Sequence, residues 1–140
     1  MNASITRVKD VMQKEVLSID GMASATEVAA MMRASKVSEL LVAKRHDDDA
    51  WGIITLMDLV NGVILPGRNA EKVFAYEIMT KPVLTIPAQM DIRYAIRLIQ
   101  RMRIHRAPVE HLGEIVGMVT LSSLILDNQL LVPSEDSALA

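Results

Sequence analysis

Two stretches of this chain repeat each other, and this repeat restricts the possible fold more than any other feature of the sequence. Met12 begins Met-Gln-Lys-Glu-Val-Leu-Ser-Ile, and Met79 begins Met-Thr-Lys-Pro-Val-Leu-Thr-Ile, so the offset is 79 − 12 = 67. The segments 52–56 and 117–121 also match, and their offset is 117 − 52 = 65. We therefore expect two copies of one supersecondary unit, whose length difference lies in a surface hairpin near residues 46–50.

Each copy is expected to have the order strand, helix, strand, strand, helix. The series Ser24-Ala25-Thr26-Glu27 has the form of a capping box and predicts that a helix begins there, and Asp91 is the expected N-cap of the matching helix in the second copy. The closing helices are expected at 56–64 and 121–130, before Leu65-Pro66-Gly67 and Pro133. The expected strands are 16–19, 40–43 and 51–54 in the first copy, and 83–86, 107–109 and 115–119 in the second.

One such unit is small and buries too little of its surface to be stable alone. We therefore expect an α/β (α+β) fold in which two β-α-β-β-α repeats pack sheet to sheet around a shared core, with pseudo-two-fold symmetry. The repeats are placed at 7–65 and 76–130, together one module, and residues 131–140 are expected to form a flexible tail.

Composition excludes several classes of protein. The chain has 140 residues and a formal net charge of −2, whereas dedicated nucleic-acid binders carry a basic excess. It contains no Cys, which rules out disulfides, thiolate catalysis and Cys-ligated zinc. The N-terminus lacks the apolar core of a signal peptide, and no apolar run is long enough for a membrane helix. We expect a cytoplasmic protein with no nucleic-acid or membrane partner.

The motifs, taken in order and twice, resemble paired cystathionine-β-synthase (CBS) domains over roughly residues 7–130. The resemblance implies a regulatory, non-enzymatic CBS pair, or Bateman module. It also implies clefts between the repeats that hold AMP, ADP, ATP or S-adenosylmethionine, and it leaves open a structural or interaction module with empty clefts. The motifs are Val8-Lys9-Asp10-Val11-Met12, Tyr76-Glu77-Ile78-Met79, Gly52-Ile53-Ile54-Thr55-Leu56-Met57-Asp58 and Gly117-Met118-Val119-Thr120-Leu121-Ser122-Ser123.

Thr55 and Asp58 are the first candidate ligand residues. Thr55 stands where the expected strand 51–54 meets the closing helix, at its N-cap, and Asp58 follows one helical turn later, so both side chains project near one helix end. The resemblance assigns Thr55 to a phosphate and Asp58 to the ribose hydroxyls, but Thr-x-x-Asp also fits an ordinary helix cap, and both interpretations stay open. The second copy keeps Thr120 and has Ser123 in place of the carboxylate. We therefore predict one strong site and one weak site.

A basic cluster that enters the middle strand of the second copy supplies the other candidates: Arg103, His105, Arg106 and Pro108. It resembles the His-Arg-x-Pro-Val segment of the nucleotide-binding γ subunit of AMP-activated protein kinase, in which the His and Arg meet phosphates. Arginine provides a permanently charged, bidentate contact to a phosphate. The alternative is that these are solvated charges at a strand edge.

The first copy differs in charge at the matching positions. The offset that aligns Met12 with Met79 also places Ser38 and Glu39 opposite His105 and Arg106, and Glu39 would repel a phosphate. In the CBS family the clefts lie between repeats. The resulting hypothesis is that Asp58 shares one site with His105 and Arg106.

Catalysis and metal binding are not expected. No nucleophile–base pair, metal set or phosphate-binding glycine loop has useful spacing. The run Asp47-Asp48-Asp49 lacks the spaced oxygens and the turn glycine of a calcium loop, and it is read as a polar hairpin tip. Arg93, Arg97 and Arg101 recur along one helix face and are read as a solvated stripe, with an anionic docking surface as the alternative.

The apolar closing helices predict self-association. Residues 56–64 and 121–126 carry more apolar side chains than one small pair can bury, and a closed two-fold homodimer would cover them. Ligand binding would then be reported to a separate effector protein, with the adenosine ligand and a second copy as the other expected partners.

Overall fold

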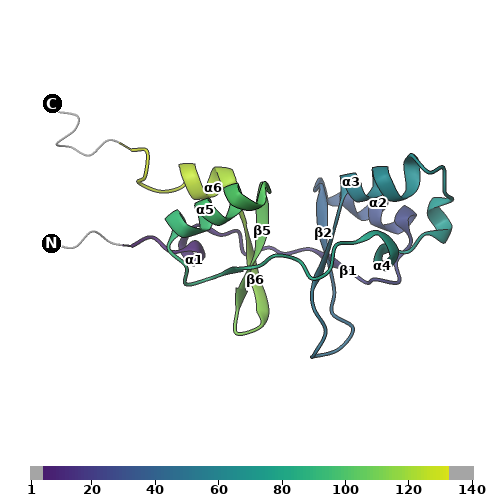
Figure 1. Cartoon of the computed structure of the whole chain (residues 1–140), viewed down its shortest axis with the longest axis horizontal. Helices are drawn as coiled ribbons and strands as arrows, with labels where there is room; N and C mark the ends of the chain where they lie inside the picture. Colours follow the sequence, from purple (N-terminus) through teal and green to yellow (C-terminus); the bar gives the residue numbers. More distant parts are fainter. Residues whose placement is uncertain (1–4, 133–140) are drawn as a thin grey trace, which may run out of the picture. The chain divides into compact units, whose positions relative to one another are not determined.

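The computed structural model describes residues 5–132, which fold into two compact units of mixed helix and sheet (Figure 1). The first unit runs from Leu17 to Val83. The second unit combines the segment that ends at Val16 with the chain from Leu84 onward. Each unit contains one three-stranded sheet and its own cluster of buried side chains.

The first unit has the sheet order β1-β2-β3, with β1 parallel and β3 antiparallel to the central strand β2. The helix α2 connects the two parallel strands, and short helices follow β3. Its elements are β1 (Ser18–Ile19), α2 (Ala25–Ser35), β2 (Glu39–Val42), β3 (Gly52–Thr55), α3 (Leu56–Leu59), the π-helical η1 (Val60–Ile64), the 3₁₀ helix η2 (Ala70–Lys72) and α4 (Ala75–Ile78).

The second unit repeats this arrangement with the sheet order β4-β5-β6 and the same strand directions. The predicted order strand, helix, strand, strand, helix is confirmed in both copies, and with it the mixed α and β fold class. The predicted sheet-to-sheet packing stays a prediction. The elements are α1 (Val8–Val11), β4 (Ile86–Pro87), α5 (Ile92–Met102), β5 (Arg106–His111), β6 (Glu114–Thr120) and α6 (Leu121–Leu126).

Strand register shows where the two copies differ in length. Val42 pairs with Gly52 in the first unit, and Val109 pairs with Gly117 in the second. The two paired residues are 52 − 42 = 10 positions apart in the first unit and 117 − 109 = 8 positions apart in the second. The extra two residues of the first copy therefore lie in its hairpin, as the sequence predicted.

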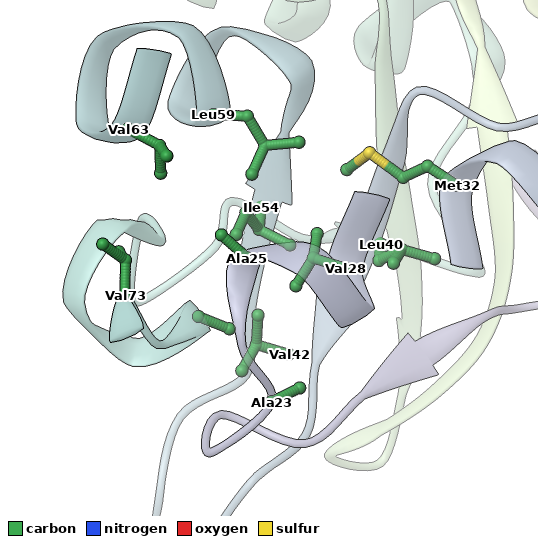
Figure 2. Close-up of a cluster of buried hydrophobic side chains, with 11 residues drawn as sticks. Ala23, Ala25, Val28, Met32, Leu40, Val42, Ile54, Leu59, Val63 and Val73 are labelled. Carbon is green, nitrogen blue, oxygen red and sulfur yellow. The ribbon is translucent and has the colours of Figure 1, made fainter. Parts of the chain in front are cut away.

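The core of the first unit lies between its sheet and its helices (Figure 2). Val28 and Met32 lie one turn apart on α2 and therefore share a face, which packs over Leu40 of β2 and Ile54 of β3. Leu40 and Ile54 also form a cross-strand pair. Together these contacts make this face of the sheet apolar. The other buried members are Ala23, Ala25, Val42, Leu59, Val63, Val73 and Ala75.

The leading segments of the two repeats are exchanged between the units. Val8 of α1 is completely buried in the core of the second unit, and its amide donates to the Met90 carbonyl at 2.9 Å. In Figure 1, α1 accordingly lies beside α6, at the other end of the chain. In the first unit, Ala75 of α4 is buried and donates its amide to the Ala23 carbonyl at 2.8 Å. A structural unit is therefore not one continuous sequence repeat, and the repeat bounds 7–65 and 76–130 stay predictions.

Both predicted helix N-caps are confirmed. Ser24 Oγ accepts from the Glu27 amide at 3.1 Å, and Asp91 Oδ1 accepts from the Arg93 amide at 2.9 Å. The Ser24 box is incomplete, because the Glu27 carboxylate accepts from the Ser24 hydroxyl and not from its backbone amide. These caps satisfy amides that a helix itself leaves without partners.

Several predicted element bounds are wrong. The closing helix does not reach residue 130: α6 ends at Leu126, because the side chain of Asn128 donates to the Leu124 carbonyl and competes with the helix ladder. The strand predicted at 83–86 begins only at Ile86, since the Val83 amide donates to Trp51 in the first unit at 2.9 Å. The strand predicted at 16–19 is reduced to Ser18–Ile19. Pro133 and most of the predicted tail lie outside the described residues.

Candidate ligand site

The two sheets have equivalent ends where the third strand meets the closing helix. In the second unit the Leu121 amide donates to the His105 carbonyl at 2.7 Å. In the first unit the Leu56 amide donates in the same way to the Ser38 carbonyl at 3.1 Å. This shared contact supports the predicted equivalence of Ser38 and His105.

The neighbouring residues extend this equivalence and show that it reverses the charge. Arg106 pairs with Thr120 across the second sheet, and Glu39 pairs with Thr55 across the first. The cation of one unit thus stands where the other unit has a carboxylate.

A pocket of about 480 Å³ opens at this end of the second unit. It brings together three predicted site residues, His105, Arg106 and Thr120. It also includes Ser122, which is not among the residues predicted from the sequence although it stands between two candidates in the Thr-Leu-Ser-Ser motif. The pocket lining therefore combines cationic and hydroxyl-bearing side chains with apolar ones. The apolar lining comes from Leu121, Ile125 and Leu126.

Hydroxyl groups at this end are arranged by the start of α6. Thr120 Oγ1 accepts from the Ser123 amide at 3.0 Å and lies 3.0 Å from Ser122 Oγ. Ser123 is buried, accepts from the Thr120 amide at 3.2 Å and donates to the Thr120 carbonyl at 3.0 Å. The Ser123 hydroxyl is thus used inside the fold, whereas the exposed Ser122 lines the pocket.

The other two candidates of the basic cluster lie outside the lining of this pocket. Arg103 is exposed at the C-cap of α5, in the left-handed region with φ of 56°, like its counterpart Lys36 in the first unit. Pro108 is buried in β5 opposite Met118. The sequence placed these residues in one motif, but Arg103 lies at the helix cap that precedes β5, and Pro108 lies inside the strand.

At the corresponding end of the first unit, Thr55 and Asp58 form a reciprocal capping box. The Thr55 amide and hydroxyl donate to Asp58 Oδ2 at 2.8 and 3.1 Å, and the Asp58 amide donates to Thr55 Oγ1 at 3.3 Å. Asp58 Oδ1 has no such partner within residues 5–132. Oδ2 of Asp58 therefore acts as a helix cap. A ligand role for Oδ1 stays a prediction, and so does a site that Asp58 shares with His105.

The groups with shifted pKa values lie elsewhere. Hydrogen bonding to Lys81 and to the Arg45 amide holds the pKa of Asp49 far below its usual value. The Arg68 guanidinium lowers the pKa of Glu77, with which it forms an ion pair at 2.8 Å. Within residues 5–132, no group of three or more His, Asp or Glu residues could hold a metal ion, and no helix is both long and apolar enough to span a membrane. The geometry of the pocket suits binding of an anion with an apolar part.

Two equivalent β-α-β-β-α units with differently charged sheet ends define a tandem-repeat module. The model of the CBS domain matches this chain twice, at residues 8–64 and 75–126. The chain belongs to the CBS-domain family.

Relatives of this chain include a Methanopyrus kandleri protein and an enzyme. The chain is 31% identical to the uncharacterized protein MK0525 from Methanopyrus kandleri, over 84% of this chain and 60% of that protein. It is 26% identical to inosine-5′-monophosphate dehydrogenase from Thermoplasma acidophilum, over 95% of this chain and 26% of the enzyme. The likeness to the dehydrogenase is thus confined to a minor part of that enzyme.

Solved structures with the same fold include an oligomer and a ligand complex. The hexameric CBS-CP12 protein from bloom-forming cyanobacteria is 28% identical, with a TM-score of 0.82 over 91% of this chain and 70% of that one. The CBS domain pair of protein MJ0100, solved with 5′-methylthioadenosine and S-adenosyl-L-methionine, is 25% identical, with a TM-score of 0.71 over 86% of this chain and 94% of that one.

Proposed function

We propose that this CBS pair is a non-enzymatic regulatory module that binds an adenosine-containing ligand such as AMP, ADP, ATP or S-adenosylmethionine. The observation that carries the proposal is the pocket of about 480 Å³ in the second unit, whose lining combines Arg106 and His105 with apolar side chains. Its volume lies in the range of small-molecule sites, which combine apolar walls with a few polar groups. The MJ0100 complex supports the choice of an adenosine compound, because its two ligands share that group.

The residues of the pocket divide naturally between the parts of such a ligand. Arg106 and His105 offer charge-assisted hydrogen bonds to a phosphate. The hydroxyls of Thr120 and Ser122 offer further donors beside them, and Leu121 and Ile125 offer apolar surface to the base. In the first unit, Oδ1 of Asp58 is the proposed acceptor for ribose hydroxyls. Binding would shift the populations of two conformations, which a separate effector protein in the cytoplasm reads.

The test is a thermal-unfolding series with AMP, ADP, ATP and S-adenosylmethionine, with GTP as the specificity control. A ligand at a hundredfold excess over its Kd adds about 2.7 kcal/mol to the free energy of unfolding. For a domain of this size we expect Tm to rise by roughly 2–8 °C. The substitution Arg106→Ala should remove the rise, while Arg101→Ala, which removes an exposed arginine of α5 that does not line the pocket, should keep it.

The opposite result would favour the alternative function, a structural or interaction module with empty clefts. If no adenosine compound changes Tm, or if Arg106→Ala leaves the rise intact, the proposed site is wrong. Repeating the series with Asp58→Asn tests the proposed role of the first unit separately, because this variant keeps the shape of the side chain and removes its charge.

We also propose that the chain self-associates through its closing helices. Four apolar side chains on α3, at the end of η1 and directly after it are at least half exposed: Leu56, Met57, Ile64 and Leu65. Leu126 of α6 is also exposed. Burying such a surface against a second copy is the usual way to remove it from water. Sedimentation velocity should show a mass above that of one chain, and Met57→Glu should reduce it. A mass of one chain at every concentration would contradict this proposal.

A further inference from the structure

The first unit has a second pocket, of about 500 Å³, at the other end of its sheet. The parallel strands β1 and β2 both end here, and Asp20 and Ala43, which follow them, line the pocket. Thr55, by contrast, pairs with Glu39 at the start of β2. This pocket is therefore separate from the end of the sheet at which Thr55 and Asp58 lie.

One wall of the pocket is positively charged overall. Asp49 Oδ1 lies 2.6 Å from Lys81 Nζ, and Asp49 Oδ2 accepts from the Arg45 amide at 2.9 Å and lies 3.5 Å from Arg45 Nε. Both oxygens of Asp49 are therefore occupied, and one carboxylate faces two cations. The terminal guanidinium nitrogens of Arg45 make no ion pair within residues 5–132, and 77% of that side chain is exposed. This wall offers donors to a carboxylate.

The pocket also contains one carboxylate that is not neutralised. Asp20 Oδ1 accepts from the Met22 amide at 2.7 Å. The other oxygen, Oδ2, has no hydrogen bond or ion pair within residues 5–132, and the residue is exposed. Because an ionised carboxylate only accepts hydrogen bonds, Asp20 suits an ammonium group. The pocket lining thus combines this carboxylate with the positively charged group formed by Arg45, Lys81 and Asp49.

The lining of the same pocket also includes apolar groups. The ring of Tyr76 stacks on Phe74 with centroids 6.1 Å apart, and the Tyr76 amide donates to the Gly21 carbonyl at 2.9 Å. Met22 is 65% exposed, and Met79 lines the same pocket. Aromatic and thioether groups that are accessible and adaptable are suited to an apolar side chain of a ligand.

The matching place in the second unit lacks these features. The offset that aligns Met12 with Met79 pairs Asp20 with Pro87 and Met22 with Gln89, and the pocket there measures about 230 Å³. Its carboxylate, Glu110, accepts from the Thr85 hydroxyl at 2.8 Å. The dipolar pocket is thus particular to the first unit and does not follow from the repeated fold.

We infer that the first-unit pocket binds a small zwitterion, an α-amino acid with an apolar or aromatic side chain. Its carboxylate would bind Arg45 and Lys81, its ammonium group would bind Asp20, and its side chain would contact Tyr76 and Met22. This site is independent of the proposed adenosine site, and each can fail without the other.

The test is an amide NMR titration of the full chain with L-phenylalanine. Two matched analogues are titrated beside it: 2-phenylethylamine, which lacks the carboxylate, and 3-phenylpropanoate, which lacks the ammonium group. We expect L-phenylalanine to shift the signals of Asp20, Met22, Arg45 and Tyr76. Each analogue should bind at least about tenfold more weakly, because one charged side of the pocket is left without its partner.

Two variants test which charged residue of the pocket binds which charged group of the ligand. Asp20→Asn preserves the bond to the Met22 amide and should weaken L-phenylalanine at least about tenfold while leaving 3-phenylpropanoate nearly unchanged. Arg45→Gln should weaken L-phenylalanine and leave 2-phenylethylamine nearly unchanged. Asp47→Asn, on the same hairpin but outside the pocket, is the control and should change nothing.

Three outcomes would overturn the inference. The first is no shift of the pocket signals with L-phenylalanine or L-leucine up to about 10 mM, a concentration above the Kd of weak specific sites. The second is equal binding of the zwitterion and its analogues. The third is shifts located only in the second unit. An amide NMR titration with AMP is run on the same samples, so that loss of amino-acid binding and loss of nucleotide binding are measured separately.

Discussion

Replacing Val8 with Asp should cost the protein about 3–5 kcal/mol of stability, the range seen when a buried charge has no partner. Val8 is completely buried and belongs to the same cluster as Ile86, Ile99 and Leu124, although it lies far from them in the sequence. A carboxylate there would lose its hydration without gaining a hydrogen bond. Since small domains are stable by only about 5–15 kcal/mol, this is a large part of the total.

Urea unfolding followed by circular dichroism measures the effect, with Gln13→Asp as the matched control. Gln13 belongs to the same leading segment and its side chain is exposed, so the same added charge should change the free energy of unfolding by less than about 0.5 kcal/mol. Equal stabilities of Val8→Asp and Gln13→Asp would show that α1 is not part of the second core. In amide NMR spectra of Val8→Asp, the loss of native signals should be largest for residues of the second unit.

The substitution Gly117→Ala should destabilise the protein by about 1–3 kcal/mol, the usual range for overpacking. A Cβ atom at Gly117 would lie 2.7 Å from the Gln13 carbonyl oxygen and 2.7 Å from Met12 Sδ. The methionine side chain can move, but the carbonyl is held, because Gln13 and Met118 exchange two backbone hydrogen bonds of 2.8 Å. Accommodating the methyl group therefore moves the leading segment away from β6.

Substitutions of two other glycines provide a comparison for the stability loss expected of Gly117→Ala. At Gly52, the equivalent position of the first unit, the new atom would lie 3.2 Å from the Thr80 carbonyl, so Gly52→Ala should cost less than Gly117→Ala. At Gly21 the nearest atoms are 3.5 Å away, an ordinary contact, so Gly21→Ala should change stability by no more than about 1 kcal/mol in either direction. Chemical denaturation midpoints give the order, and a reversed order of the three variants would contradict the packing argument.

The local signals in the sequence predicted the parts of the fold that depend on neighbouring residues. The caps at Ser24 and Asp91 were predicted because a cap is formed by side chains within one helical turn. The hairpin that absorbs the length difference was predicted because the repeat itself marks it. The closing helix of the second copy was extended too far, since a side-chain competitor such as Asn128 leaves no periodic signal.

The candidate site was predicted only in part, for a related reason. His105, Arg106 and Thr120 line one pocket, and strand pairing places Arg106 opposite Thr120. The sequence predicts each of them as a ligand residue, but the site that it predicts joins His105 and Arg106 to Asp58. The motif predicts Ser123 as a ligand residue, but its hydroxyl is hydrogen-bonded within the helix cap. Ser122 was missed because nothing in the sequence says which of two adjacent serines faces outward.

The sequence by itself determined the two copies, the order of their elements and the reversed charges at equivalent strand ends, since all three are properties of local pattern and of comparison within the chain. Only the tertiary structure decided that Val8 completes the second core, that Gly117 must leave room for Gln13, and that Asp20 and Lys81 line one pocket. These contacts join residues many positions apart. They depend on how whole elements pack, and side-chain packing leaves no period in the sequence by which it could be predicted.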